Sequence, residues 1–382
     1  MPADACPPTG CRPGADGVPA RGAVRELVGS CPGACQAGRA YLTVAVLSAA
    51  ASIVGDMTPH SGTLGGGQAL AEDLEQYRRE LTGYCYRMLG SVFDAEDAVQ
   101  ETIVRGWRGF EGFEGRSATR SWLYRIATNV CLDMLRGSQR RARPMDMGPS
   151  RASDSFTGAT LPDHTWLQPI PDTRVLPESG DPAELAASKE SVRLAFVAAL
   201  QYLPARQRAV LILREVLRWQ AAEVADLLDT SVASVNSALQ RARATMSERN
   251  TDEPVPDVAS GGQRALLARY VDAFERYDIT SLVSLLHEDA VMTMPPFDFW
   301  LRGSGEIEKF FRGPGEHCRG SRVIATEANG CAAFAAYAPA DGGGREPWAV
   351  QIIETSGDRI TGHHNFIDAG LFAAFGLPAR LP

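Results

Sequence analysis

Residues 224–246, VADLLDTSVASVNSALQRARATM, constrain the fold of this chain more than any other stretch. Two short helical patterns are separated here by Asp-Thr-Ser, and Ser231 is placed to cap the second one. Small and apolar residues give the first pattern an inner face: Ala222, Ala225 and Leu228. Spacings of three and four predict one buried stripe on the second: Val232, Val235, Leu239, Ala242 and Met246. The stretch therefore predicts two packed helices joined by a tight turn.

The residues outside that stripe have the composition of a helix that binds DNA. They are Ser234, Asn236, Ser237, Gln240, Arg241 and Arg243. The leading side chains are short enough to approach base edges, and the trailing arginines can hold phosphates. This arrangement is typical of the recognition helix in a helix-turn-helix. A helical hairpin in an all-α domain is the alternative interpretation.

Residues 94–110 carry an acidic face. Asp94, Asp97 and Glu101 recur at helical spacing and share one side of a helix. An apolar stripe lies beside them: Ala98, Val99, Ile103 and Trp107. The face is either a solvated side of a bundle helix or a docking surface for a basic protein partner. DNA is excluded as its partner, because carboxylates repel phosphates.

The charge balance inverts between residues 116 and 143. Arginines stand at positions 116, 120, 125, 136, 140, 141 and 143, and the one acid is Asp133. Trp122 and Tyr124 are interleaved with them. Arginines neutralise phosphates, and exposed aromatic rings can stack on unpaired bases, which is worth about 1–3 kcal/mol per base. The segment is predicted to contact nucleic acid, with core packing as the alternative role for Trp122.

Composition limits the remaining possibilities. A chain of 382 residues has room for two or three domains, and its net charge of -8 argues against a basic nucleic-acid binder as a whole. The eight cysteines form no CxxC and no zinc spacing, so no metal or cofactor is predicted, and Cys85 and Cys131 are expected to be buried. A metal or redox site on the first four cysteines, at positions 6, 11, 31 and 35, is the alternative. The apolar run of residues 41–55 is shorter than the roughly 20 residues of a membrane span. No membrane association is expected.

The chain divides into segments of different pattern. Residues 1–70 are rich in Gly, Pro and Ala and are expected to be a disordered extension, or translation from an upstream start with Met57 as the true one. Helical patterns occupy 71–143 and 186–249, and a proline-rich linker, 144–185, joins them. Residues 262–382 begin with an amphipathic helix and continue in strand-like runs, which predicts an α+β domain with a curved sheet wrapped on helices.

Two of these segments resemble a known family. Residues 88–136, which contain DAEDAVQET and WLYRIATN, resemble domain 2 of extracytoplasmic-function (ECF) sigma factors of bacterial RNA polymerase. Residues 194–246, which contain LPARQR, resemble domain 4 of the same family. The resemblance implies a cytoplasmic transcription initiation factor without enzymatic activity. Its partners would be core RNA polymerase and promoter DNA.

The resemblance also assigns roles to residues. Docking on the polymerase clamp helices would involve Asp94, Glu96, Asp97, Gln100 and Glu101. Residues near the melted −10 element, where a base is flipped into a protein pocket, would be Arg116, Ser117, Thr119, Trp122, Arg125 and Asn129. Residues in the major groove of the −35 element would be Ser234, Asn236, Ser237, Arg241 and Arg243. The linker would run near the active-site channel, and its TWLQPIPD (residues 165–172) is too patterned for a featureless tether.

The last block, residues 262–382, resembles the SnoaL-like domain, a cone-shaped α+β fold shared with ketosteroid isomerases. The motifs are YVDAFERYDITSLVSLLHEDAVMTMPP and HHNFIDAGLFAAFGLP. In ECF subfamilies that carry this domain it is understood to regulate the sigma factor. The expected architecture is therefore two all-α sigma domains followed by an α+β SnoaL-like cone.

Catalysis by the cone would need a general base in an apolar pocket. His287, Asp289, His363 and His364 are the candidates, but no oriented acid–base pair emerges, and no catalytic residue is predicted. A ligand pocket without chemistry or a protein-contact module remain open. The pocket would be lined by Met292, Met294, Phe297, Phe299, Trp300 and His363, and its small-molecule ligand is unknown. Ordinary core packing is the alternative role for the methionines and aromatic residues of this set. Two rival functions also remain: a helix-turn-helix regulator that acts without polymerase, and a DNA-binding protein with a SnoaL-like enzyme domain.

Overall fold

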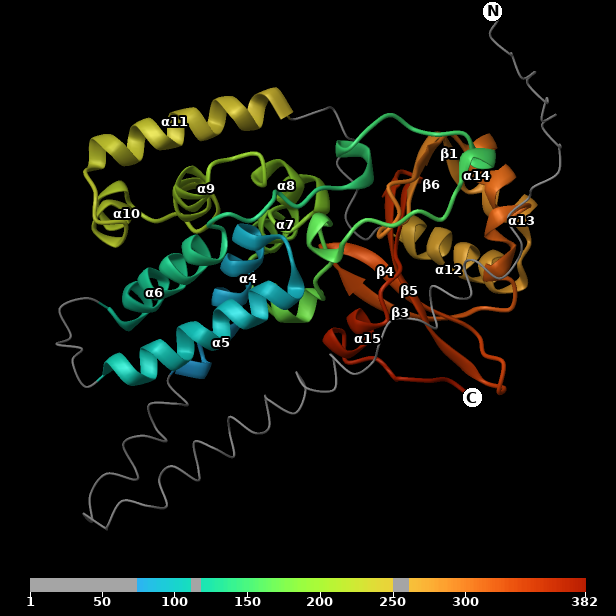
Figure 1. Cartoon of the computed structure of the whole chain (residues 1–382), viewed down its shortest axis with the longest axis horizontal. Coiled ribbons are helices and arrows are strands. Elements are labelled where there is room, and N and C mark those ends of the chain that lie inside the picture. Colours follow the sequence, from blue (N-terminus) through green and yellow to red (C-terminus); the bar gives the residue numbers. More distant parts are fainter. Residues whose placement is uncertain (1–73, 111–117, 250–260) are drawn as a thin grey trace, which may run out of the picture. The chain divides into compact units, whose positions relative to one another are not determined.

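In the computed structural model, residues 74–110, 118–249 and 261–382 are described (Figure 1). The predicted extension, 1–70, lies outside these residues, as do Arg116 and Ser117. The described residues fall within one compact unit of the chain, residues 53–382.

The first group of helices comprises α4 (Arg78–Leu89), α5 (Val92–Gly109) and α6 (Thr119–Met134). Gly90 ends α4 in the left-handed conformation, and the Ser91 hydroxyl caps α5 by accepting a hydrogen bond of 3.1 Å from the Asp94 amide. Cys85 and Cys131 are buried in this group, as expected. Trp107 is 49% exposed, which corrects its predicted place in the apolar stripe. The buried position in that turn is Gly106, where a side chain would press against Leu123 of α6.

The second group comprises α7 (Pro182–Glu190), α8 (Leu194–Leu200), α9 (Ala205–Leu211) with a π turn (Ile212–Val216), α10 (Ala221–Leu227) and α11 (Val232–Arg249). Ser231 caps α11 as predicted, accepting a hydrogen bond of 3.1 Å from the Ser234 amide. The middle of the predicted stripe is confirmed, since Val235, Leu239 and Ala242 are buried. Val232 and Ala222 are exposed, because both lie in the first turn of their helices, next to exposed turns.

The C-terminal block is built on one six-stranded sheet in the order β2-β1-β6-β5-β4-β3. The strands are β1 (Leu286–Thr293), β2 (Trp300–Arg302), β3 (Arg322–Ala328), β4 (Cys331–Pro339), β5 (Arg345–Ser356) and β6 (Arg359–Phe366). β1 and β6 are parallel, and every other pair is antiparallel. With the helices that surround this sheet, the block is the expected α+β unit.

Helices cover both faces of the sheet. One face carries α12 (Gly261–Arg276), α13 (Ile279–Ser284) and α14 (Ser304–Phe311), followed by a 3-10 turn (Pro314–Cys318). Tyr270 of α12 packs there against Phe334 and His363. The other face carries α15 (Gly370–Ala374), where Phe372 meets Tyr337. That second face belongs to the same hydrophobic cluster as the buried residues of α4, α6 and α8.

The predicted linker packs against its neighbours. Within residues 144–181 it forms the 3-10 turns Pro144–Asp146, Ser153–Ser155, Asp163–Thr165 and Asp172–Arg174. Trp166, Leu167 and Ile170 are buried, in agreement with the patterned character of residues 165–172. Isolated β-bridges connect the linker to the C-terminal block, from Thr160 to Phe297 and from Pro171 to Ala328.

Candidate functional site

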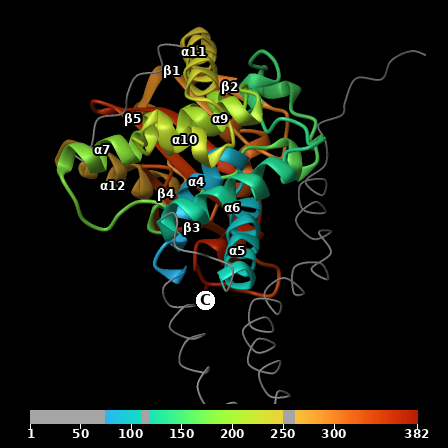
Figure 2. The same cartoon turned by 90° about the vertical axis from the view of Figure 1, so that its left-hand side faces the viewer.

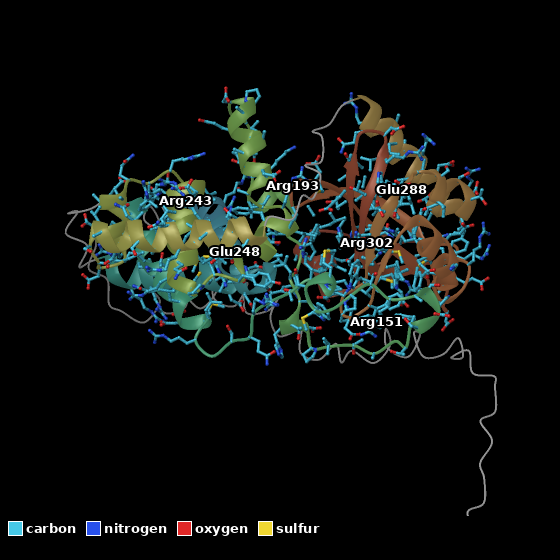
Figure 3. All side chains as sticks on the ribbon, turned by 90° about the horizontal axis from the view of Figure 1, so that it is seen from above. Arg151, Arg193, Arg243, Glu248, Glu288 and Arg302 are labelled. Atoms are coloured by element: carbon cyan, nitrogen blue, oxygen red, sulfur yellow. The ribbon has the colours of Figure 1, made fainter. Side chains whose placement is uncertain are left out.

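The predicted recognition surface lies on the exposed side of α11. Ser234, Asn236, Ser237, Arg241 and Arg243 are all exposed. Figure 3 shows Arg243 and Glu248 on this helix. Arg241 donates a hydrogen bond of 2.7 Å to the Ser237 hydroxyl, and Arg243 forms an ion pair with Glu215 of the π turn. Asn236, Gln240 and Arg243 line a groove with Arg214. The surface combines short polar groups with cations, as contact with a DNA groove requires.

The expected polymerase-docking residues lie on α5, and two of them form ion pairs with arginines outside this helix. Asp94 forms an ion pair of 2.6 Å with Arg141, and Glu96 forms one of 3.1 Å with Arg174 of the linker. Glu101 pairs within its helix with Arg105, at 2.7 Å. Asp97 is exposed and Gln100 is partly buried. A basic partner of this face would therefore compete with arginines of the same chain at its N-terminal end.

The described residues of the expected −10 surface lie on α6. Arg125 and Asn129 are exposed, whereas Thr119 and Trp122 are partly buried. The ring of Trp122 covers Gly109 of α5, where an added Cβ would lie 3.3 Å from it. Arg125 donates a hydrogen bond of 2.8 Å to the backbone oxygen of Asp226 in α10. The surface expected to meet the −10 element thus contacts the helix-turn-helix of its own chain.

Tyr124 and Trp219 extend this contact. Tyr124, expected among the exposed aromatic residues, is fully buried, and its ring lies 5.0 Å from that of Trp219. Burial raises the pKa of Tyr124 far above neutrality. The Arg120 guanidinium lies over the Trp219 ring, 5.4 Å from its centroid. Sequence analysis missed Trp219, because helical periodicity carries no signal for a pairing between two separate domains.

Buried arginines hold the loops between these helices. Arg208 of α9 donates hydrogen bonds to the backbone oxygen of Met88 and, at 2.7 Å, to the side-chain oxygen of Gln201. Arg87 of α4 reaches Ser191, before α8, with hydrogen bonds of 3.0 and 2.6 Å. Burial lowers the pKa of each arginine to about 10, so both remain charged at pH 7. Neither was predicted as a functional residue.

The tip of the β3–β4 hairpin joins three parts of the chain. Asn329 and Gly330 form its two-residue turn, both at positive φ, as a type I′ hairpin requires. The Asn329 side-chain amide donates hydrogen bonds of 2.7 Å to the Tyr86 hydroxyl and 2.6 Å to the Val192 backbone oxygen. Its side-chain oxygen accepts one of 3.0 Å from the Ile170 amide. This fully buried side chain connects α4, the linker and the segment before α8.

Asp172 completes the hairpin contact. Its carboxylate accepts a hydrogen bond of 2.8 Å from the Gly330 amide. Burial raises the pKa of Asp172 to about 6, and the bond from Gly330 opposes part of that rise. A carboxylate that resists ionisation therefore lies at the contact between the linker and the C-terminal block.

His363 lies within a buried polar network in the C-terminal block. Its Nε2 is 3.0 Å from the Tyr270 hydroxyl, which donates a hydrogen bond of 2.9 Å to Gln351. Burial lowers the pKa of His363 to about 3, so the imidazole is neutral at pH 7. His364 contacts Thr293 and Glu354 instead, at 3.0 and 3.3 Å. Both histidines are buried, and they enter different networks.

The predicted pocket residues are all buried: Met292, Met294, Phe297, Phe299, Trp300 and His363. Phe297 and Phe299 contact Phe156 of the linker, with ring centroids 5.1 Å away in each case. The indole nitrogen of Trp300 donates a hydrogen bond of 2.9 Å to the Gly148 oxygen. Within the described residues, this part of the predicted pocket is covered by the linker.

Comparison with known families matches the three parts separately. Residues 73–141 match Sigma-70 region 2, and residues 193–246 match Sigma-70 region 4. Residues 267–363 match the SnoaL-like domain. The fold and the matches together define a transcription initiation factor of the sigma-70 class.

Similar proteins narrow this class. The chain is 45% identical over 320 residues to the ECF RNA polymerase sigma factor SigG of Mycobacterium tuberculosis, covering 80% of this chain and 83% of that protein. It is 29% identical over 251 residues to the ECF RNA polymerase sigma factor SigJ of the same species, covering 63% of this chain and 72% of SigJ. The crystal structure of SigJ superposes with a TM-score of 0.52 at 22% identity, covering 80% of this chain and 99% of SigJ. The chain belongs to the ECF family of RNA polymerase sigma factors.

Membership assigns the chain to transcription initiation factors rather than enzymes. Across the described ranges, 74–110, 118–249 and 261–382, no cluster of three metal-binding side chains occurs. Nor does any helix there have the length and apolarity needed to span a membrane.

Proposed function

We propose that this chain binds core RNA polymerase in the cytoplasm and directs it to its promoters. Asp94, Glu96, Asp97, Gln100 and Glu101 of α5 are the proposed polymerase-binding residues. The −35 element is assigned to Ser234, Asn236, Ser237, Arg241 and Arg243. The −10 element is assigned to Arg116, Ser117, Thr119, Trp122, Arg125 and Asn129. The exposure of the polar side of α11 supports this assignment, as do the matches to regions 2 and 4.

The SnoaL-like domain is proposed to restrain this activity. The observation that carries the proposal is the Asn329 contact, which connects the sheet to region 2, the linker and the start of region 4. While region 4 is held there, Arg125 remains bonded to Asp226 of α10. Region 2 must be released from α10 before its −10 surface can meet DNA. We call the state in which α6 is bonded to α10 the closed arrangement. A contact that favours it lowers the fraction of molecules able to initiate transcription.

A ligand pocket without chemistry is proposed within the SnoaL-like domain, lined by Met292, Met294, Phe299, Trp300 and His363. The burial of these side chains and the neutral His363 support binding of an uncharged molecule.

In vitro transcription with core polymerase tests the sigma assignment. Transcripts from a genomic promoter library should begin at specific sites that depend on the full chain. Initiation without promoter preference, by a chain that binds polymerase, would refute the proposed promoter recognition.

A further inference from the structure

A segment of the linker, residues 148–161, lies along the SnoaL-like domain, and we name it the strap. Backbone hydrogen bonds run from Arg151 to Trp300, 3.0 Å, and from Leu161 to Pro296, 2.9 Å. The Ser153 amide donates one of 2.9 Å to the Glu306 carboxylate. Arg151 also forms an ion pair of 2.8 Å with Asp298. Arg151 and Arg302 are labelled in Figure 3, the first on the strap and the second on the sheet.

The strap inserts one aromatic side chain into the domain. Phe156 is 9% exposed, whereas Asp154, Ser155 and Thr157 beside it are exposed. Its ring meets Phe297, Phe299 and Phe310 edge-on, with centroids at 5.1, 5.1 and 5.7 Å, and we name these three residues the aromatic cage. Edge-to-face geometry on three sides is the preferred packing of aromatic rings. The cage is thus already shaped around one aromatic ring.

The cage continues into the interior toward a polar atom without a partner. Phe310 contacts Phe311, and Phe311 stacks on His363, with centroids 6.1 Å apart in both pairs. His363 is 1% exposed, and its Nδ1 has no hydrogen-bond partner among the described residues. Leaving a buried polar atom unpaired is unfavourable, so this atom is a natural site for a hydrogen bond from a ligand.

The hydrogen-bond network fixes what Nδ1 can accept. Gln351 donates through its side-chain nitrogen to Asn365, 3.1 Å, so its oxygen accepts the Tyr270 hydroxyl proton. Tyr270 has then used its one proton, and His363 must donate from Nε2 to the Tyr270 oxygen. Because the imidazole is neutral, Nδ1 carries a lone pair. It can accept a hydrogen bond from a hydroxyl or N–H group.

We propose that the aromatic cage is a binding site for a small uncharged aromatic molecule with one hydrogen-bond donor, and that Phe156 occupies this site in the present state. The ligand ring replaces Phe156, and its donor meets His363 Nδ1 only where the ligand extends inward past Phe310 and Phe311. Expulsion of Phe156 loosens the strap, which is then held by its backbone hydrogen bonds and the Arg151–Asp298 ion pair. This inference rests on the ligand pocket of the proposed function and adds the ligand class and the displaced residue.

Calorimetric titration of the full chain with 2-naphthol tests the proposal. Phe156→Ala should bind 2-naphthol at least ten-fold more tightly than the natural chain, because the competing ring is gone. Phe156→Leu, which keeps an apolar plug, should fall between them. Phe372→Ala is the matched control: it removes a buried ring on the opposite face of the sheet and should leave the affinity unchanged. Equal affinity of Phe156→Ala and the natural chain, or no binding by a folded Phe156→Ala, would overturn the proposal.

A second probe tests the hydrogen bond and the strap. 2-Methoxynaphthalene lacks the donor and should bind Phe156→Ala several-fold more weakly than 2-naphthol, a difference that His363→Phe should abolish. In the natural chain, saturating 2-naphthol should speed hydrogen exchange of the amides of residues 151–161. Unchanged exchange at saturation would contradict displacement. These outcomes are independent of promoter-specific transcription, so failure of the ligand site and failure of the sigma assignment are distinguishable.

Discussion

The side-chain nitrogen of Asn329 donates a hydrogen bond of 2.7 Å to the hydroxyl of Tyr86, 243 residues earlier in the chain. This bond joins a hairpin of the SnoaL-like domain to the first helix of region 2. The Tyr86 hydroxyl in turn donates a hydrogen bond of 2.8 Å to the backbone oxygen of Gln168 in the linker. Figure 2 shows these elements in a second view, with β3, β4 and α4 labelled. The closed arrangement therefore depends on a small polar contact at a hairpin tip.

Asn329→Gly should weaken that contact by about 2–4 kcal/mol, because three buried hydrogen bonds are lost while the positive φ of 54° remains easy to adopt. Amide exchange in α6 and α10 should become faster. The control is Asp358→Gly, in an exposed turn of the same domain, which should change nothing in those helices. Protected α6 amides in Asn329→Gly would mean that the hairpin does not hold the closed state.

Charge reversal at Asp97 and Glu101 should reduce affinity for core polymerase at least ten-fold. Both side chains are exposed on α5, so the thermal unfolding midpoint should hardly change. Binding can be measured by fluorescence anisotropy of labelled chain. Reversal at Glu346 and Asp358 on the SnoaL-like domain is the matched control and should leave affinity intact. Full polymerase binding by Asp97→Lys, Glu101→Lys would rule out this docking face.

The double variant Arg241→Ala, Arg243→Ala should weaken binding of the holoenzyme to duplex −35 DNA. Each lost phosphate contact should also reduce the slope of log affinity against log salt by about 1. A titration series in potassium chloride measures both effects. Arg276→Ala is the control, because it removes the same kind of side chain from the exposed end of α12, and it should leave promoter binding unchanged. An unchanged footprint and slope would mean that α11 does not contact the promoter.

Asp172 makes the hairpin contact dependent on pH. Its pKa in the folded chain is about 6, above the ordinary value of 3.8, so between these values the folded chain binds more protons than the unfolded chain. The contribution of Asp172 to the free energy of unfolding is therefore greatest below about pH 4, and it is lost as the pH rises through 6. Asp172→Asn keeps an acceptor for Gly330 and should be about 1–3 kcal/mol more stable than the natural chain at pH 7.5.

Chemical denaturation of the two chains at pH 4.5, 6 and 7.5 measures this difference, since other titrating groups cancel between them. The advantage of Asp172→Asn should grow steadily from the lowest pH to the highest. A constant difference would show that Asp172 does not titrate in this range.

The sequence predicted the elements and the family but not the contacts between domains. Helical spacing correctly identified Val235, Leu239 and Ala242 as buried and the polar side of α11 as exposed. Both results follow because α11 packs against the protein along one face only. The sequence pattern misplaced Trp107 and Tyr124. Trp107 is exposed because Gly106 takes the buried position in that turn, and Tyr124 is buried because it packs on Trp219 of another domain.

The interdomain residues could not be found in the same way. Arg141 was predicted among phosphate-binding arginines, yet it pairs with Asp94, because a cation satisfies a nearby carboxylate as readily as a phosphate. Asn329 has the signal of a two-residue hairpin turn, but periodicity does not reveal that its side chain enters another domain.

Multi-round in vitro transcription with core polymerase, comparing the natural chain with Asn329→Gly on a genomic promoter library, tests the central claim most directly. The account predicts promoter-specific transcripts from both chains, starting at the same sites, with several-fold more product from Asn329→Gly. Equal or lower output from a folded Asn329→Gly would contradict restraint by the SnoaL-like domain. Absence of promoter-specific initiation from either folded chain would contradict the proposed sigma activity itself.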